Sequence, residues 1–377
     1  MRSHAKYHHE IDLLRGFAII SLIITHICSF CFAIKGINAI VLVNIPIIIF
    51  SRFAVPVFVF ISGFVLYLKY NKHINYKDFY KKRFLKIIPP YLIFSLIYYF
   101  WNNLIINDTS LNIKKLLYQI LIAKAHIHLW YFLLIIQLYL LFPLILKIYL
   151  KIKRKSLFVL VIFIVQIVWR IIHPEIKEKI HCDVCNIFQI ILRDVIFDRR
   201  FFLSHIAYLI FGFYLSENIT FFKKDIIRII AVITIIITVA INSFIYIKGI
   251  NIYDSLVNIP RSFLIPNRII NIILFTATIV ILYQIAKRVT NYSESNLFLK
   301  TVKEYGLHSY GIYLIHAGVI NGLSIILIKA GFSYSNIFFY ILLFILVTPI
   351  SYYLSMFISK LPYAEYVIGK RIEKIKK

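Results

Sequence analysis

The chain has 377 residues, of which 61% are hydrophobic and 16% charged, and its mean hydropathy is +0.83. Repeated apolar runs of about 20 residues exclude a soluble globular core and predict an all-α integral membrane protein. The net charge of +27 does not indicate a nucleic-acid-binding protein, because no soluble domain is expected that would present a basic surface.

The hydropathy pattern predicts a bundle of about ten transmembrane helices in a single domain, residues 1–377, with short loops. The first run is too long for a cleavable signal peptide and lacks a small-residue cleavage site. The predicted spans are residues 11–34, 47–68, 87–106, 129–149, 157–172, 201–215, 226–247, 269–286, 310–328 and 337–358.

The first span carries three ionisable residues, Asp12, Arg15 and His26. Such groups are costly at membrane depth unless they face a cavity or a partner, so they indicate a functional site. Arg15 and His26 are eleven positions apart, which places them on the same helix face about 16 Å apart along the axis. Asp12 precedes Arg15 by three residues, the spacing of a helical ion pair. It either orients Arg15 for function or forms a plain ion pair at the helix end.

The second and fourth spans add polar residues at the depth of His26. Arg52 lies near the start of the second span, and His126, His128 and Trp130 lie near the start of the fourth. A neutral imidazole at this depth is able to act as a general base, because the ordinary histidine pKa of about 6.5 is close to working pH. The alternative for each histidine is a hydrogen bond between helices. Trp130 either stacks on a bound molecule or anchors the helix at the membrane interface.

A basic run precedes the third span. Lys82 and Lys86 are four residues apart, and Arg83 and Lys86 three apart, so they form one cationic edge if the helix extends this far. Clustered basic side chains bind phosphate and pyrophosphate groups through charge-assisted hydrogen bonds. The alternative is positive flanking of a membrane span that contacts anionic lipid. Pro89 and Pro90 follow and are expected to kink the helix.

Basic residues also predict the orientation. Of the 43 Lys and Arg residues, 27 fall on the side that carries both termini, so the N- and C-termini are expected in the cytoplasm. The long connection at residues 173–200 then lies outside and is a candidate cap over the outer mouth. Its proline and acidic residues are Pro174, Glu175, Glu178, Asp183, Asp194 and Asp198.

Four cysteines form two C-x-x-C pairs, Cys28 with Cys31 and Cys182 with Cys185. The topology places both pairs toward the outside, where a disulfide is allowed. A zinc site is disfavoured because about 150 residues separate the pairs. Free thiols are the default expectation, and no metal is expected.

Several fragments together resemble the membrane-bound acyltransferase-3 family over the whole chain. Residues 10–16 with His26 resemble the family's first span, and residues 52–58 with 61–64 its second. Residues 82–91 are similar to its Arg-Arg-x-x-Arg-Ile-x-Pro-x-Tyr signature, which ends here at Tyr91. Residues 128–131, 138–139 and 143 resemble its fourth span. Residues 309–316 resemble its penultimate span and end at His316, to which we assign no role.

The resemblance implies transfer of an acyl group from a cytoplasmic acyl-CoA, usually acetyl-CoA, to a hydroxyl of an extracytoplasmic glycan or lipid-linked sugar. It implies His26 as the base and Arg15 along the donor path. The predicted catalytic residues are therefore His26, Arg15 and Asp12, with Asp12 orienting Arg15. The implied donor-binding residues are Arg15, Lys82, Arg83, Lys86 and Tyr91, and the acceptor-side residues are Arg52, His128 and Trp130. Lysines replace two arginines of the signature, which keeps the charge but loses bidentate geometry.

A transporter or exporter of surface polysaccharide is the alternative function. The same buried polar residues would then line a substrate or proton path. Two related halves with paired broken helices, which are typical of many transporters, are not evident in the sequence.

Overall fold

The structure is a computed structural model that describes residues 8–106, 110–180, 186–220, 222, 224–255, 257–260, 263–293 and 295–369. Within these ranges the chain forms helices and no strand, and nine helical segments are long and apolar enough to cross a membrane. The prediction of an all-α, multi-pass membrane protein is confirmed. The longer helices are α1 (His9–Cys28), α2 (Ala39–Ser51), α3 (Ala54–Tyr70), α4 (Tyr76–Phe100), α6 (Trp130–Lys151), α7 (Lys155–Lys179), α10 (Asp225–Tyr253), α11 (Ile265–Val289), α13 (Ser309–Lys329) and α14 (Ile337–Lys360).

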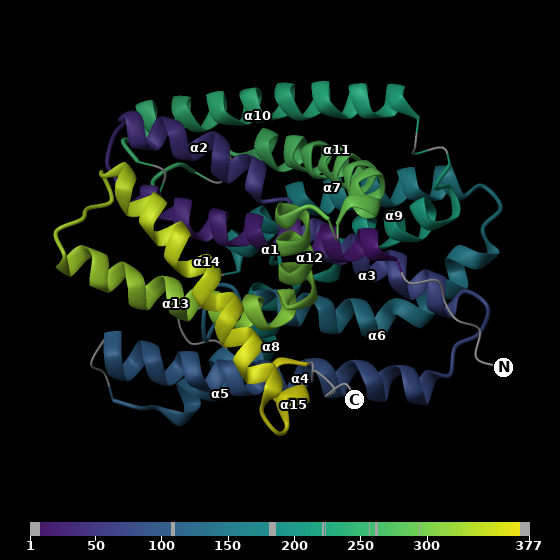
Figure 1. The fold of residues 1–377 in the computed structure, drawn as a ribbon, viewed down its shortest axis with the longest axis horizontal. Helices are drawn as coiled ribbons and strands as arrows, with labels where there is room; N and C mark the ends of the chain where they lie inside the picture. Colours follow the sequence, from purple (N-terminus) through teal and green to yellow (C-terminus); the bar gives the residue numbers. More distant parts are fainter. Residues whose placement is uncertain are drawn as a thin grey trace.

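Helix α1 lies in the middle of the bundle (Figure 1). It contacts α2, α3, α11, α13 and α14, and it packs extensively against the short helix α12 (Leu297–Leu307). Gly16 makes the contact with α12 close, because a Cβ atom at this position would lie 1.9 Å from the carbonyl oxygen of Val302. The helix that carries Arg15 and His26 is therefore held on all sides by protein.

The predicted second span is two helices, α2 and α3, that meet at a turn at Arg52 and Phe53. Pro56 explains the break, because it lacks the N–H that would donate to the Arg52 carbonyl in a continuous helix. Ser21 of α1 donates a hydrogen bond to the carbonyl oxygen of Ser51 at 2.8 Å, which satisfies part of the interrupted backbone. The break thus places Arg52 beside α1.

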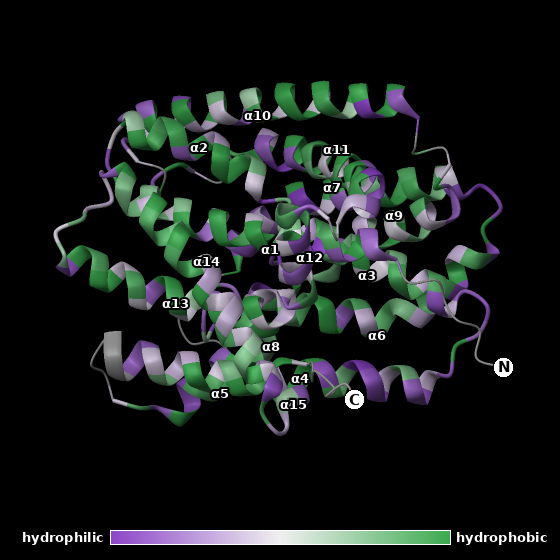
Figure 2. Cartoon of the chain, viewed as in Figure 1, coloured by the Kyte–Doolittle hydropathy of each residue, from purple (hydrophilic) through white to green (hydrophobic). Residues whose placement is uncertain are grey.

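Helix α4 begins at Tyr76, eleven residues before the predicted third span, and Asn75 caps it by accepting from the N–H of Asp78. The basic run at residues 81–86 therefore lies on a helix, as the cationic-edge hypothesis required. Hydrophilic residues gather along this first part of α4, whereas α10 and α14 are largely hydrophobic (Figure 2). The apolar surfaces of α10 and α14 are exposed and suit contact with lipid.

The predicted sixth span is shorter than expected. Helix α9 (Ile206–Glu217) has 12 residues and is about 18 Å long, less than the ~30 Å hydrocarbon core. It packs closely on α3 instead of facing lipid along its length. A Cβ atom at Gly63 would lie 2.0 Å from the Leu209 carbonyl oxygen, and one at Gly212 would lie 2.4 Å from the Phe60 carbonyl oxygen.

Two predicted loops contain short helices. Helix α12 lies between the eighth and ninth spans and crosses the long helices at a steep angle (Figure 1). Helix α5 (Ile113–Leu121) lies between the third and fourth spans and exposes Ile113, Leu117 and Leu121 along one side. Such a spacing is typical of a helix at the membrane interface.

Replacement of Gly212 by Ala tests the close contact between α3 and α9. The added methyl group overlaps the α3 backbone, so we expect a loss of about 1–3 kcal/mol of stability. Thermal unfolding in detergent should show a clearly lower midpoint for this variant. Gly322→Ala on α13 is the matched control, because a Cβ atom there meets nothing within 4 Å and the substitution should not lower the midpoint.

Candidate active site

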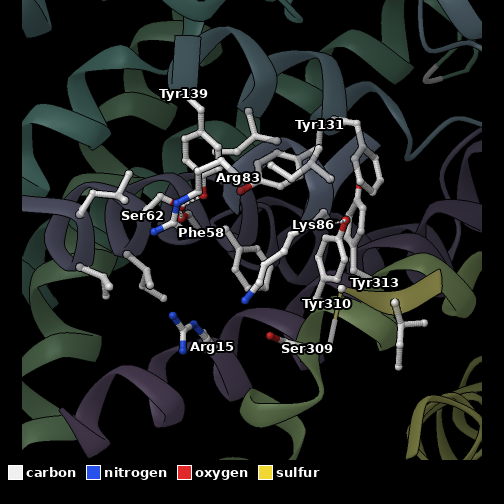
Figure 3. Close-up of a pocket in the computed structure, with 18 of the residues that line it drawn as sticks. Arg15, Phe58, Ser62, Arg83, Lys86, Tyr131, Tyr139, Ser309, Tyr310 and Tyr313 are labelled. Carbon is white, nitrogen blue, oxygen red and sulfur yellow. Dashed lines mark hydrogen bonds between the residues drawn. The ribbon is translucent and has the colours of Figure 1, made fainter. Parts of the chain in front are cut away.

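The first of two cavities on α1 lies near the start of the helix and has a volume of about 380 Å³. We call it the Arg15 cavity. Arg15, Lys86 and Ser309 point toward the same part of this space (Figure 3). No acidic residue lines it within the described part of the chain, so its charge is positive. Its polar lining residues are Arg15, Ser62, Arg83, Lys86, Tyr131, Tyr139, Ser309, Tyr310 and Tyr313.

Three of the five predicted donor-binding residues, Arg15, Arg83 and Lys86, meet in the Arg15 cavity. Lys82 is exposed and does not line it. Tyr91 does not line it either, because its hydroxyl donates to the Ile120 carbonyl oxygen and its ring packs on another aromatic ring.

Asp12 supports Arg15 from outside the cavity. Its carboxylate accepts a hydrogen bond from Arg15 Nη1 at 3.1 Å, and its relative exposure is only 2%. Gly306 of α12 packs against the same turn, where a Cβ atom would lie 1.8 Å from the Asp12 carbonyl oxygen. Asp12 lines neither cavity, so its geometry is that of a residue that positions Arg15.

The second cavity lies near the end of α1 and has a volume of about 510 Å³. We call it the His26 cavity. His26, Arg52 and Trp130, which the sequence analysis placed at one depth, all line it. The ring nitrogens of His26 form no hydrogen bond to any residue that the structure describes, so a lone pair is available to a bound molecule. The other charged or titratable lining residues are Arg170, Arg199, His205 and Arg268.

These four additional residues were not among the predicted site residues. Arg170 carries a signal that would have found it, because it interrupts the apolar run of the fifth span. Arg199 belongs to a connecting segment and has no such signal. Its position depends on how residues 186–204 fold back over the bundle.

Four histidine rings form a chain that leads away from the His26 cavity. The centroids of His26 and His316 are 5.2 Å apart, those of His316 and His128 5.1 Å, and those of His128 and His126 4.9 Å. His128 was predicted on the acceptor side, but it is buried and lines neither cavity. Its Nδ1 is 2.8 Å from Nδ1 of His126, and burial in this loop lowers the His126 pKa to about 4. Both rings are therefore neutral at pH 7.

His316, for which the sequence suggested no role, lies between the two cavities. Its Nδ1 is 2.7 Å from the carbonyl oxygen of Tyr313, so that nitrogen carries the proton and Nε2 holds a lone pair. Nε2 is buried and has no hydrogen-bond partner among the described residues. Its ring contacts Tyr313 of the Arg15 cavity and His26 of the other. This is the geometry of a residue that orients His26.

The two cavities are separate in this structure. The stripe on the first span predicted one path from Arg15 to His26, but the cavities share no lining residue. Tyr131, Tyr313 and His316 lie between them, and the rings of Tyr131 and Tyr313 are 5.6 Å apart. A molecule that reaches from one cavity to the other has to displace these rings.

The structure describes part of the connection that was predicted as an outer cap, residues 173–200. Helix α7 continues to Lys179, so Pro174, Glu175 and Glu178 belong to a helix and not to a loop. Asp183 lies outside the described residues. Asp194 and Asp198 form ion pairs in the segment that follows, and this segment carries Arg199 into the His26 cavity.

Asp194 is the centre of that ion-pair cluster. Its carboxylate is 3.0 Å from Lys124 Nζ and from Arg193 Nη2, and the Tyr118 hydroxyl donates to it at 3.0 Å. Burial alone would raise the pKa of Asp194, but these hydrogen bonds outweigh it and lower the pKa to about 2. The cluster fixes the segment against α5 and the loop before α6.

The described cysteines, Cys28 and Cys31, are buried free thiols at the end of α1. Cys182 and Cys185 lie outside the described residues. Among the residues that are described, no group of three or more His, Cys, Asp or Glu side chains has the geometry to hold a metal ion.

A comparison with protein families finds a match that agrees with the helical membrane fold. The model of the acyltransferase-3 family, described as an acyltransferase domain, matches residues 8–356. The chain therefore belongs to this family of membrane acyltransferases. Searches among curated proteins and among solved structures find no match.

Replacement of Asp194 by Asn tests the ion-pair cluster. We expect it to lower stability at pH 7 by on the order of 1–3 kcal/mol, because half-buried cationic donors lose their buried, charged acceptor. The folded-state pKa is depressed, so the contribution of Asp194 is present above about pH 4 and disappears as pH falls toward about 2. Unfolding midpoints of the two proteins should converge over that range.

Asp225→Asn is the control for this measurement. Asp225 pairs with Arg228 but is largely exposed, and an exposed pair contributes little. A loss at Asp225 equal to that at Asp194 would contradict the assignment.

Proposed function

We propose that this protein transfers an acyl group, with acetyl as the first candidate, from acyl-CoA to a hydroxyl of an extracytoplasmic glycan or lipid-linked sugar. The observation that carries this proposal is that Arg15 and His26, on one helix, each line a cavity at a different depth. One cavity suits a polyanionic donor and the other contains a base. The family supports acyl transfer as the reaction.

The Arg15 cavity is suited to the phosphates of a coenzyme A thioester. Arg15, Arg83 and Lys86 supply three positive charges, and Arg83 is held over the Tyr139 ring at 5.4 Å. Guanidinium and ammonium groups bind phosphate oxygens through strong, short hydrogen bonds. The nearby aromatic rings provide flat apolar surface beside these charges.

The transfer step needs one base and no covalent enzyme intermediate. His26 removes the proton of the acceptor hydroxyl while its oxygen attacks the thioester carbonyl carbon, so a C–O bond forms and the C–S bond breaks. The thiolate leaves and receives that proton from the imidazolium. The His316 ring lies 5.2 Å from the His26 ring, and this contact keeps the His26 imidazole directed at the hydroxyl.

Passage of the acyl group between the cavities requires movement of Tyr131 and Tyr313. Side chains change rotamer quickly compared with enzyme turnover, so donor binding in the Arg15 cavity is the natural trigger. The acceptor then stays on its own side of the membrane. We place the protein in a bacterial plasma membrane with both termini cytoplasmic, on the distribution of basic residues.

A transporter remains the alternative from another functional class. Two cation-lined cavities at different depths also suit an anion path. Purified protein in detergent and in sealed vesicles separates the two functions. Acceptor-dependent consumption of thioester indicates transfer, whereas movement of solute without donor turnover indicates transport.

Replacement of His26 by Ala tests the base. We expect the rate of acyl transfer to fall by about 10²–10⁴-fold, with little change in the donor KM, because proton removal is lost and the donor cavity is intact. His73→Ala is the control, since His73 is exposed in the loop between α3 and α4. Transfer at an undiminished rate by His26→Ala would exclude this mechanism.

Two lysines one turn apart on α4 test the donor site. Lys86 lines the Arg15 cavity and Lys82 does not, although both are exposed and both belong to the family signature. We expect Lys86→Ala to raise the donor KM by about tenfold and Lys82→Ala to change it less than about twofold. Equal effects of the two variants, measured by initial rates at varied donor concentration, would contradict the assignment of this cavity.

A further inference from the structure

The His26 cavity contains more positive charge than the attack of a neutral hydroxyl requires. Four arginines line it, and they come from four separate parts of the chain. Arg52 lies at the break between α2 and α3, Arg170 on α7, Arg199 in the segment before α9, and Arg268 on α11. None of the lining residues in the described chain is Asp or Glu.

Three of these arginines have no carboxylate partner among the residues described. Arg52 Nη1 donates to the Tyr246 hydroxyl at 3.0 Å, and its guanidinium lies 5.8 Å from that ring. Arg199 lies over the Trp130 ring at 4.9 Å. Arg170 has a buried Nε with no hydrogen-bond partner. Aromatic rings and a hydroxyl hold Arg52 and Arg199 in place, and none of the three guanidinium groups is directly bonded to a carboxylate within the described chain.

The arrangement is costly for the protein alone. Buried charges in proteins are normally paired, because removal from water without a counter-ion is unfavourable. Arg52 and Arg170 are half-buried, and Arg199 is exposed beside the cavity that it lines. Desolvation by the surrounding protein lowers the pKa of Arg199 to about 10. The nearby Arg200, Arg52 and Arg170 also lower this pKa, whereas Asp198 raises it. The missing component is an anion.

We propose that the acceptor carries a phosphate or pyrophosphate group, which Arg52, Arg170 and Arg199 bind in the His26 cavity beside the hydroxyl to be acylated. This inference rests on the proposed function, because it names the chemical class of the acceptor at the same site. The guanidinium fork matches phosphate oxygens bidentately. Three arginines without a carboxylate partner match the multiple negative charge of a phosphate group better than the single charge of a carboxylate.

The arginines and His26 have different roles in this cavity. The arginines hold the anionic group, while His26 on the opposing α1 faces the hydroxyl that reacts. Tight binding of a group remote from the reacting atoms positions the hydroxyl and lowers the entropic cost of the reaction. A sugar linked to a lipid through a pyrophosphate has both parts in one molecule.

Inorganic pyrophosphate is the probe for a binding experiment on purified protein in detergent. Because pyrophosphate is also expected to bind the Arg15 cavity, the measurement uses the Lys86→Ala variant as background. We expect pyrophosphate to raise the unfolding temperature of this variant, phosphate to do so less, and glucuronate least. Adding Arg199→Gln, or Arg170→Gln as a second variant, should weaken pyrophosphate binding by at least about tenfold.

Lys248→Gln is the matched control in the same background. Lys248 lies on α10 two residues after Tyr246, but it is exposed and does not line the cavity. Removing its charge should leave pyrophosphate binding within about twofold of the background value. Equal weakening by Lys248→Gln, or glucuronate binding as strong as that of pyrophosphate, overturns the proposal.

Acyl transfer to defined acceptors completes the test and separates acceptor phosphate from lipid-headgroup phosphate. A polyprenyl-diphosphate sugar should be acylated faster than the same sugar without its phosphates, and added anionic phospholipid vesicles should not restore activity toward the free sugar. Restoration by the vesicles would assign the arginines to lipid headgroups. Efficient transfer to the free sugar would overturn this inference but leave the proposed function intact. Pyrophosphate binding at Arg199 without any acyl transfer would support the anion site but contradict the proposed function.

Discussion

The cost of burying positive charge inside an apolar bundle is the constraint on which this structure depends. Ionisable groups at membrane depth need a partner, a cavity or a ligand. Asp12 supplies a partner for Arg15. In the segment of residues 186–204, Asp194 pairs with Lys124 and Asp198 with Arg200. Arg83 and Lys86 face the first cavity, and Arg52, Arg170 and Arg199 face the second, where each could meet a bound anion.

Close helix packing fixes the residues at those positions. Gly16 and Gly306 let α1 and α12 approach until their backbones touch, and this contact is next to the turn that carries Asp12 and Arg15. At the other end of α1, Ser21 bonds to the broken backbone at Ser51, and Thr25 donates to the Ser51 hydroxyl at 2.8 Å. A site assembled from helices that are distant in the sequence thus depends on a few small residues at helix contacts.

Much of the fold was predictable because apolar periodicity and span length are local properties of the sequence. The ends of α6, α10 and α14 agree with prediction within a few residues. The failures have physical causes: Pro56 breaks the second span, α9 is stabilised by packing on α3 and needs no full membrane length, and α12 lies in a segment without a span signal. Each depends on contacts between segments distant in sequence.

In the candidate site, too, features set by local sequence were predictable and features set by contacts between distant segments were not. The shared face of Arg15 and His26 follows from helix geometry, and both residues line cavities. The position of Arg199 in the cavity and the contact of His316 with His26 were not predictable. Both arise when residues 186–204 and α13 pack beside α1. The depth of His128 was predicted, but its distance from the cavity was not, since depth does not determine which way a side chain points.

The rings that divide the two cavities have a consequence for the membrane itself. A continuous water column lined by cations would conduct chloride and other small anions, and the cell would lose the voltage across its envelope. Tyr131, Tyr313 and His316 interrupt that column with uncharged aromatic surface. The aromatic layer between the two cavities would therefore act as an electrical insulator within the bundle.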